Sequence, residues 1–117
     1  LRLGKEKKEV NVVADQYGSP TYTADLAPLL VKMIETDKYG VYHATNEGVC
    51  SWAEFAEEIF RIAEIRVKVN YITADKYLTK AKRPLNSRLS KEKLEKYFCR
   101  LPFWKTALEK LIKINEQ

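Results

Sequence analysis

The sequence has few of the residues on which small specialised scaffolds depend: two cysteines, one histidine and four glycines among 117 residues. Cys50 and Cys99 are too few and too far apart for a disulfide scaffold, and adding His43 does not give a paired set of metal ligands. We expect both thiols to be reduced and at least half-buried. No apolar run approaches the ~20 residues of a membrane span, and residues 1–9 lack the apolar segment of a secretory signal. These absences predict a soluble, cytoplasmic protein with no membrane partner.

Positive charge is concentrated in one segment. The chain carries a net charge of +5 at pH 7, while residues 80–100 alone hold eight Lys or Arg against two Glu, a net charge of +6. Such a local cluster favours an anionic ligand at one place over a surface that follows a nucleic-acid duplex, and solvated helix lysines are the alternative explanation for most of these charges. Nucleic-acid binding also predicts exposed aromatics among the lysines. The aromatics of this segment, Tyr97 and Phe98, are expected to be buried.

Strands and helices are expected to alternate around a single core. Short segments rich in β-branched and aromatic residues predict strands at residues 10–14, 40–44 and 67–72. Apolar periodicity predicts helices at about 25–35, 51–64, 91–98 and 102–114, with a single helical turn over 73–79. Because helices separate the strands, we expect parallel pairing between the first two strands, a βαβ unit in an α/β fold, followed by a mainly helical part.

Two serines stand where helix caps are expected. Ser51-Trp52-Ala53-Glu54 has the spacing of a capping box, and Ser90 precedes the helix predicted over 91–98. In the helix after Ser51, apolar residues recur at intervals of three and four, which predicts one buried face. The residues on that face are Trp52, Phe55, Ala56, Ile59, Phe60 and Ala63.

The start of the helix at 25–35 has two possible positions. With Thr23 as N-cap, Pro28 falls inside the helix and removes a backbone hydrogen bond, whereas with Asp25 as N-cap no bond is lost. Asp25 is therefore favoured. In the last helix, either Phe103 or Trp104 is expected in the core.

Two strand-to-helix passages carry polar groups. Residues 15–21, Asp-Gln-Tyr-Gly-Ser-Pro-Thr, follow a strand, and ligands of α/β proteins usually bind at such a place. A plain turn shaped by its Asp, Gly and Pro explains the same residues equally well. In the second passage, residues 42–48, His43 alternates along a predicted strand and has no Ser or Cys partner in a hydrolase pattern. No catalytic residue is therefore assigned.

A third polar segment, residues 81–89, lies within the basic cluster. Arg83 precedes the rigid Pro84, and its guanidinium group can offer a planar pair of donors to phosphate oxygens. Asn86 and Ser87 add short polar groups. A solvated basic loop is the alternative.

Four blocks in a fixed order span nearly all of the chain. They are Val12-Val13-Ala14-Asp15-Gln16-Tyr17-Gly18-Ser19-Pro20-Thr21-Tyr22-Thr23 with Asp25-Leu26-Ala27, then Gly40-Val41-Tyr42-His43-Ala44-Thr45-Asn46-Glu47-Gly48 with Ser51-Trp52 and Phe55-Ala56, then Ala81-Lys82-Arg83-Pro84 with Asn86-Ser87, and finally Trp104 with Leu108. Together they resemble the C-terminal part of the dTDP-4-dehydrorhamnose reductase family, a branch of the extended short-chain dehydrogenase/reductase superfamily. Such reductases convert dTDP-4-dehydro-L-rhamnose to dTDP-L-rhamnose with NADPH or NADH, in deoxysugar and polysaccharide biosynthesis.

The resemblance implies an NAD(P)-binding Rossmann-type fold, of which residues 1–117 form one substrate-binding unit. The superfamily's hydride chemistry needs a Gly-rich turn and a Tyr-x-x-x-Lys pair, and the sequence has neither. We therefore interpret the chain as a C-terminal fragment that lacks the dinucleotide-binding domain, binds no cofactor and is inactive alone. Its sheet is expected to have an uncovered edge, which self-association would cover. Magnesium is possible by family resemblance, but no ligand set here can be assigned to it.

The resemblance also implies a set of residues that contact the dTDP-sugar, with Arg83 at the diphosphate. These substrate-binding residues are Gln16, Gly18, Pro20, Thr21, Arg83 and Asn86. No residue is expected to be catalytic, cofactor-binding or metal-binding. Two other functions stay open, a non-enzymatic nucleotide-binding regulatory subunit of the same superfamily and a small basic nucleic-acid-binding domain.

Overall fold

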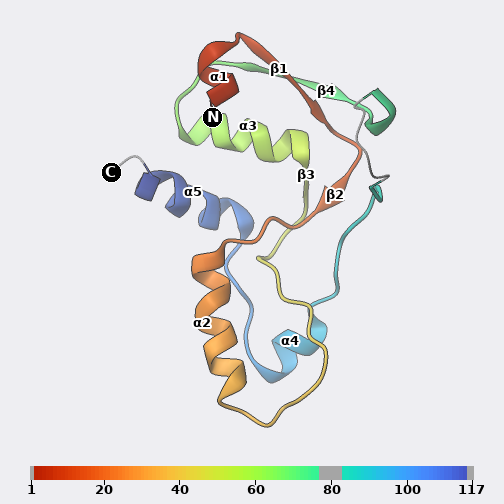
Figure 1. The fold of residues 1–117 in the computed structure, drawn as a ribbon, viewed down its shortest axis with the longest axis vertical. Helices are drawn as coiled ribbons and strands as arrows, with labels where there is room; N and C mark the ends of the chain where they lie inside the picture. The colour runs from red at the N-terminus through yellow and green to blue at the C-terminus, as the bar shows by residue number, and fades with distance from the viewer. Residues whose placement is uncertain (1, 77–82, 116–117) are drawn as a thin grey trace.

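The fold is that of a computed structural model, which describes residues 2–76 and 83–115. Helices and strands alternate along the first part of the chain, and helices follow (Figure 1). In order, the elements are α1 (Arg2–Glu6), β1 (Glu9–Val13), β2 (Tyr17–Gly18), α2 (Thr23–Ile34), β3 (Cys50–Ser51), α3 (Trp52–Ile62), β4 (Lys68–Ile72), the 3-10 helix η1 (Ala74–Lys76), α4 (Glu92–Tyr97) and α5 (Trp104–Asn115). The predicted α/β class is confirmed.

The main sheet has two parallel strands, β1 and β4, in which Asn11 lies opposite Asn70. Both strands were predicted, but the predicted pairing of β1 with residues 40–44 is wrong, because residues 41–46 form no strand. The described residues add no third strand to this sheet, so the outer edges of β1 and β4 have no strand partner within them.

The segment at 40–44 resembles a strand only in its alternation. Tyr42 and Ala44 pack against the core, whereas Val41 is 78% exposed and His43 is exposed as well. Alternation of this kind requires an extended backbone but no neighbouring strand. Just beyond this segment, the Glu47 backbone donates to the Pro102 carbonyl and accepts from the Trp104 N–H instead.

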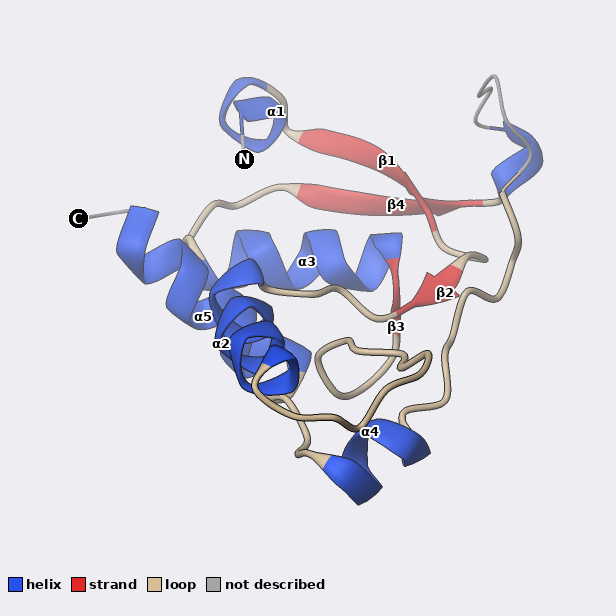
Figure 2. Cartoon of the chain, turned by 60° about the horizontal axis from the view of Figure 1, so that its bottom comes forward, coloured by secondary structure: helices blue, strands red, loops and turns tan. Residues whose placement is uncertain are grey.

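Two hydrophobic clusters form the core. The first, called the sheet-side core, consists of Cys50, Trp104, Leu108 and Ile112, and helix α3 lies between it and the sheet (Figure 2). The second, called the loop-side core, consists of Leu29, Leu94 and Leu101, from α2, α4 and the segment before α5. Both cysteines are free, Cys50 buried and Cys99 half-buried, as predicted.

Helix α3 begins with the predicted capping box. Ser51 Oγ accepts a hydrogen bond from the Glu54 N–H, and Glu54 Oε1 accepts one from the Ser51 N–H, both at 3.2 Å. Phe60 is buried and Phe55 packs against the sheet-side core, as expected. The prediction that Trp52 belongs to the core is wrong, since its side chain is 55% exposed. Trp52 is the first residue of the helix, and helical side chains lean toward the N-terminus, which carries the indole past the end of the core.

Helix α2 starts earlier than either predicted N-cap allows. Its N-cap is Tyr22, which makes no side-chain cap, so both Thr23 and Asp25 are wrong as caps and Pro28 lies inside the helix. The Tyr22 N–H donates to Asn46 Oδ1 at 2.6 Å, so a residue far along the chain supports this helix start. Pro28 is exposed, as is Ala24, whose carbonyl loses its helical donor there and can be hydrated instead.

The predicted cap of α4 is wrong, whereas the predictions for α5 and for the first part of the turn after β4 agree with the structure. Ser90 caps nothing, because α4 starts at Glu92 with Lys91 at the N-cap position and no side-chain cap. In α5, Trp104 is 3% exposed and Phe103 46% exposed, so Trp104 is the core residue. η1 confirms the first part of the turn predicted over 73–79, and the rest of that turn lies outside the described residues.

Candidate functional site

A cavity of about 490 Å³ lies where three distant segments meet. Its volume is within the range of small-molecule sites. Its lining is mixed, with hydroxyl and amide groups, two aromatic rings of α3 and one arginine. The lining residues are Gln16, Tyr17, Gly18, Ser19, Pro20, Thr21, Thr45, Cys50, Ser51, Trp52, Phe55, Arg83, Pro84, Ser87 and Leu89.

Strand β2 joins the three segments by backbone hydrogen bonds. On one edge it pairs antiparallel with β3, Tyr17 opposite Ser51. On the other edge, the Tyr17 N–H donates to the Leu85 carbonyl at 2.7 Å and the Tyr17 carbonyl accepts from the Ser87 N–H at 2.8 Å. The segment that follows Arg83 and the start of α3 therefore lie on opposite edges of β2, two strand spacings or about 10 Å apart.

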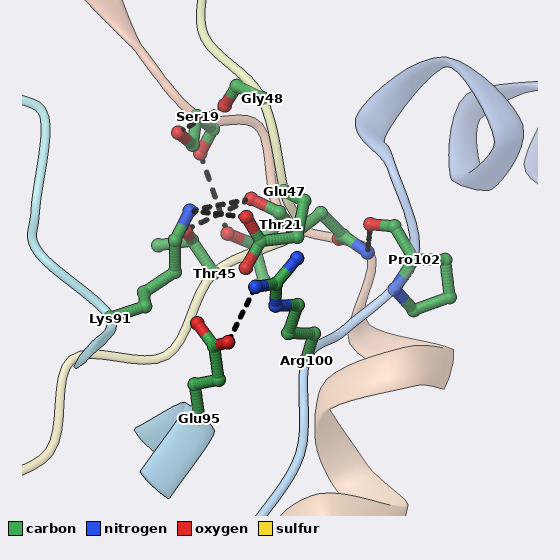
Figure 3. A network of polar contacts seen from close by, with 10 residues as sticks. Ser19, Thr21, Thr45, Glu47, Gly48, Lys91, Glu95, Arg100 and Pro102 are labelled. Carbon is green, nitrogen blue, oxygen red and sulfur yellow. Dashed lines mark hydrogen bonds and ion pairs between the residues drawn. The ribbon is translucent and has the colours of Figure 1, made fainter. Parts of the chain in front are cut away.

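Hydrogen bonds made by Ser19 and Lys91 hold the part of the cavity wall that contains Ser19 and Thr45. Ser19 Oγ donates to the Gly48 carbonyl at 2.6 Å. Lys91 Nζ donates to Thr45 Oγ1 at 3.0 Å and to the Asn46 carbonyl at 3.2 Å, and it lies 3.9 Å from Glu47 Oε2 (Figure 3). The ammonium group thus supplies a donor to the Asn46 carbonyl and to the Thr45 hydroxyl in this irregular segment.

Asn46 is the buried centre of the same network, with 0% of its surface exposed. Its Oδ1 accepts from the Tyr22 N–H, and its Nδ2 donates to Asp25 Oδ2 at 2.9 Å and to the Pro102 carbonyl at 3.0 Å. A single side chain therefore ties the start of α2 to the segment before α5.

Arg83 is the cation of the cavity. Across residues 2–76 and 83–115 its side chain has no hydrogen bond or ion pair, and the same holds for the side chain of Gln16. The neighbouring Arg88 differs, because its Nε donates to Asn86 Oδ1 at 2.8 Å. A guanidinium group in a cavity without a protein partner is suited to an anionic ligand.

Cys50 lines the cavity but is not suited to act as a nucleophile. Burial, the largest effect, and the nearby Glu54 carboxylate raise its pKa to about 11, and Lys105 only partly offsets them. The thiol is therefore protonated at pH 7, whereas the thiolate is the reactive form.

Five of the six predicted substrate-binding residues come together in the cavity: Gln16, Gly18, Pro20, Thr21 and Arg83. Asn86 is not among the lining residues, and its Oδ1 accepts from the Arg88 backbone N–H and Nε. Sequence reasoning missed Thr45 and Leu89 and assigned Trp52 and Phe55 to the core. A strand of two residues has no periodicity, so the β2–β3 pairing that brings Trp52 here left no signal in the sequence.

The described residues contain no group of three or more His, Cys, Asp or Glu placed to hold a metal ion. His43 is exposed and does not line the cavity. No helix of the described residues is long and apolar enough to cross a membrane.

The aromatics of the basic segment differ from the prediction in one respect. Phe98 is half-buried, but Tyr97 is 40% exposed, so the expectation that both are buried is wrong for Tyr97. The Tyr97 ring contacts the Tyr42 ring edge-to-face, with centroids 6.4 Å apart, and Lys96 Nζ lies 5.2 Å from its centre. This ring is already occupied by protein groups, which does not favour stacking on nucleic-acid bases.

Comparison with known proteins identifies relatives over nearly the whole chain. The chain is 41% identical to dTDP-4-dehydrorhamnose reductase of Aggregatibacter actinomycetemcomitans and 38% identical to the spore coat polysaccharide biosynthesis protein SpsK of Bacillus subtilis, with 95% and 96% of the chain covered. It spans only 42% and 39% of the lengths of these two relatives.

Solved structures of similar proteins have the same fold. The dTDP-4-dehydrorhamnose reductase of Clostridium acetobutylicum matches with a TM-score of 0.93 and 41% identity, over 99% of this chain and 42% of that one. The Bacillus anthracis reductase, in complex with NADP, matches with a TM-score of 0.90 and 43% identity, over 99% and 41%. The family model described as the RmlD substrate binding domain matches residues 1–116. The chain therefore belongs to the RmlD substrate-binding domain family.

Proposed function

We propose that the cavity binds the dTDP-sugar of a dTDP-4-dehydrorhamnose reductase, the enzyme that reduces dTDP-4-dehydro-L-rhamnose to dTDP-L-rhamnose with NAD(P)H. The observation that carries the proposal is Arg83, a cation that has no side-chain partner within residues 2–76 and 83–115 and that lines a cavity with hydroxyl and amide groups. The names of the relatives support the same activity. They favour a reductase over a regulatory subunit.

In this proposal Arg83 binds the diphosphate. Its planar guanidinium group offers two parallel donors to phosphate oxygens, and Pro84 restricts the backbone that carries it. Gln16, Gly18, Pro20 and Thr21 form the neighbouring wall, where backbone and side-chain groups meet the sugar. Asn86 contributes by shaping the turn through the hydrogen bond that its Oδ1 accepts from the Arg88 backbone N–H.

The residues of this chain do not fit the dinucleotide. A pyrophosphate cradle needs glycines at which the backbone is open to the ligand. Here the space beside Gly4 is filled by Phe60, beside Gly40 by Lys93 and beside Gly48 by Phe103, each within 3 Å of where a Cβ would stand, and only Gly18, with Ser87 Cβ at 3.7 Å, is open. A single open glycine does not make the Gly-x-Gly-x-x-Gly turn that the pyrophosphate needs. We therefore assign NAD(P)H binding, and the proton donor of the reduction, to residues outside this chain.

The chain then acts as one substrate-binding unit of a larger cytoplasmic enzyme. Purified alone, it should not oxidise NADPH with dTDP-4-dehydrorhamnose, and steady substrate-dependent oxidation would contradict this division of roles. The outer edges of β1 and β4 have no strand partner among the described residues, which leads us to expect self-association of the isolated chain. A strictly monomeric species in light scattering at high concentration would contradict that expectation.

The role of Arg83 is tested by calorimetric titration of the full-length polypeptide with dTDP and dTDP-L-rhamnose. Arg83→Ala should lose about 1.5–3 kcal/mol for both ligands, one to two orders of magnitude in affinity, because a charge-assisted bidentate contact is lost. Arg83→Lys should recover only part, since an ammonium group cannot reproduce the planar pair of donors.

Arg88→Ala is the matched control, because Arg88 belongs to the same loop but its Nε is bonded to Asn86 outside the cavity lining. It should bind within about twofold of the wild type. If Arg83→Ala binds as tightly as the wild type, the diphosphate assignment is wrong.

A further inference from the structure

We propose that Trp52 determines specificity in this cavity by stacking its indole on the sugar ring of the bound nucleotide. The inference rests on the proposed function and extends it to a residue to which the sequence assigned only a place in the core. Three features of the described residues support it: exposure, orientation and surroundings.

The two tryptophans of the chain differ sharply in exposure. Trp104 is 3% exposed within the sheet-side core, whereas Trp52 is 55% exposed and lines the cavity. An indole left open to water forgoes the stabilisation that burial gives, on the order of 25 cal/mol for each Å² of apolar surface. A ligand that covers it recovers this energy, which makes the ring a natural contact for an apolar face.

The orientation of the Trp52 ring is set by the protein. Its centroid lies 6.4 Å from that of Phe55 in an edge-to-face contact, and Phe55 lies 6.0 Å from the centroid of Trp104. The exposed ring of Trp52 is thus connected to the buried ring of Trp104 through the ring of Phe55. Such pre-organisation lowers the entropic cost of binding a ring against it.

The surroundings of Trp52 fit a saccharide. Hydroxyl and amide groups of Gln16, Ser19, Thr21 and Thr45 share the cavity with it, and the Gln16 side chain has no partner in the part of the chain that is described. A sugar ring has apolar C–H faces and a rim of hydroxyls. An aromatic plane beside hydrogen-bonding side chains complements both.

The positions of Arg83 and Trp52 indicate what each end of the ligand carries. Arg83 precedes the segment that bonds to one edge of β2, and Trp52 follows β3 on the other edge. Two strand spacings place the backbones of these two segments about 10 Å apart. A ligand that reaches both therefore carries an anionic group at one end and a ring at the other. A sugar diphosphate has this form.

The first experiment is calorimetric titration of full-length Trp52→Ala, Trp52→Phe and the control Ile34→Ala, which changes an exposed apolar residue outside the cavity lining. Trp52→Ala should weaken dTDP-L-rhamnose binding roughly tenfold and dTDP binding less than twofold. Trp52→Phe should keep most of the affinity, and Ile34→Ala all of it.

The outcomes separate this inference from the function on which it rests. If Arg83→Ala weakens both ligands and Trp52→Ala neither, the cavity function stands and the role of Trp52 is wrong. Equal losses for dTDP and dTDP-L-rhamnose would show that Trp52 contacts the base, which also overturns the proposal. If the wild type binds neither ligand, both proposals are wrong.

A second experiment measures the exposure of the indole itself. Acrylamide should quench Trp52 fluorescence strongly and that of the buried Trp104 weakly. Saturating dTDP-L-rhamnose should protect Trp52, dTDP should not, and Trp52→Phe should remove the ligand-dependent change. Full protection of Trp52 before any ligand is added would show that another part of the polypeptide covers it, and the proposal would be wrong.

Discussion

The two halves of this molecule are held together by different means. Around the sheet-side core, backbone groups pair with one another in the β1–β4 ladder and in α3 and α5. Around the loop-side core, long stretches of backbone are irregular, and the side chains of Asn46 and Lys91 supply partners to them. Stability in the first half is therefore spread over many equivalent bonds. In the second half it is concentrated in a few side chains.

The strongest test of this difference is Asn46→Ala. The substitution removes the partner that the Asn46 side chain gives to the Tyr22 N–H and to the Asp25 carboxylate, and it leaves the Pro102 carbonyl with only the Glu47 N–H as donor, so we expect a loss of about 2–4 kcal/mol in the free energy of unfolding. Asn70→Ala removes only an exposed amide contact with Asn11 in the sheet and should cost less than about 1 kcal/mol. Urea unfolding measures both, and similar losses would contradict the contrast.

A second test concerns Gly48, which has φ +90° and adjoins the residues that Lys91 supports. An added Cβ would lie 2.3 Å from Phe103 Cε2 and 2.8 Å from Trp104 Cδ1. Gly48→Ala should therefore destabilise by about 2–3 kcal/mol, from strain and from displacement of the buried Trp104. Gly18→Ala is the control, because its nearest neighbour, Ser87 Cβ, is at an ordinary 3.7 Å. Its thermal midpoint should stay near that of the wild type.

The two serines predicted as caps make a third comparison. Ser51→Ala removes the capping box of α3 and should cost about 1–2 kcal/mol, whereas Ser90→Ala should change the free energy of unfolding by less than about 0.5 kcal/mol because Ser90 caps nothing. Chemical denaturation of both variants under identical conditions gives the difference. Equal effects would mean that α4 depends on Ser90 after all.

The smallest expected effect depends on pH. The hydrogen bond from Arg61 is the largest cause that holds the pKa of the buried Glu58 below its usual value. A carboxyl with a folded-state pKa below its unfolded value, about 4.3, stabilises above that value, and the stabilisation disappears as pH falls through the folded-state pKa. Because Arg61 is mostly exposed, we expect Glu58→Gln to cost about 0.5–1 kcal/mol at pH 7. The cost should shrink as the pH falls below the ordinary carboxyl pKa of about 4.3 and through the lowered folded-state pKa; a cost independent of pH would rule out the ion pair as its origin.

Local patterns predicted the features that are local in the fold. The capping box at Ser51 and the strands at 9–13 and 68–72 each follow from a few neighbouring residues, and the structure has them. The start of α2 could not be found this way, since the Asn46 side chain that bonds the Tyr22 N–H lies 24 residues away. The partner of β1 was missed because side-chain alternation at 40–44 does not reveal whether a strand lies alongside.

In the candidate site, too, sequence patterns predicted some residues and missed others. Turn chemistry drew attention to residues 16–21 and to Arg83, which line the cavity. Trp52 has the helical spacing of a core residue, and only its place at the first position of α3 exposes it. Periodicity gives the face of a helix but not where the core ends along its axis.

The backbone hydrogen bonds of Tyr17 determine when the cavity forms during folding. The Tyr17 backbone bonds to Leu85 and Ser87 on one edge, while β2 pairs with β3 on the other, so the cavity floor requires three segments far apart in sequence. Contacts of such high sequence separation carry a large loop-closure cost and slow the folding of a chain. A partly folded chain therefore has no cavity to offer, and a ligand that binds there selects molecules whose folding is complete. At one hundred times its Kd such a ligand would add about 2.7 kcal/mol to stability, so a bound ligand would help to protect newly made chains from unfolding.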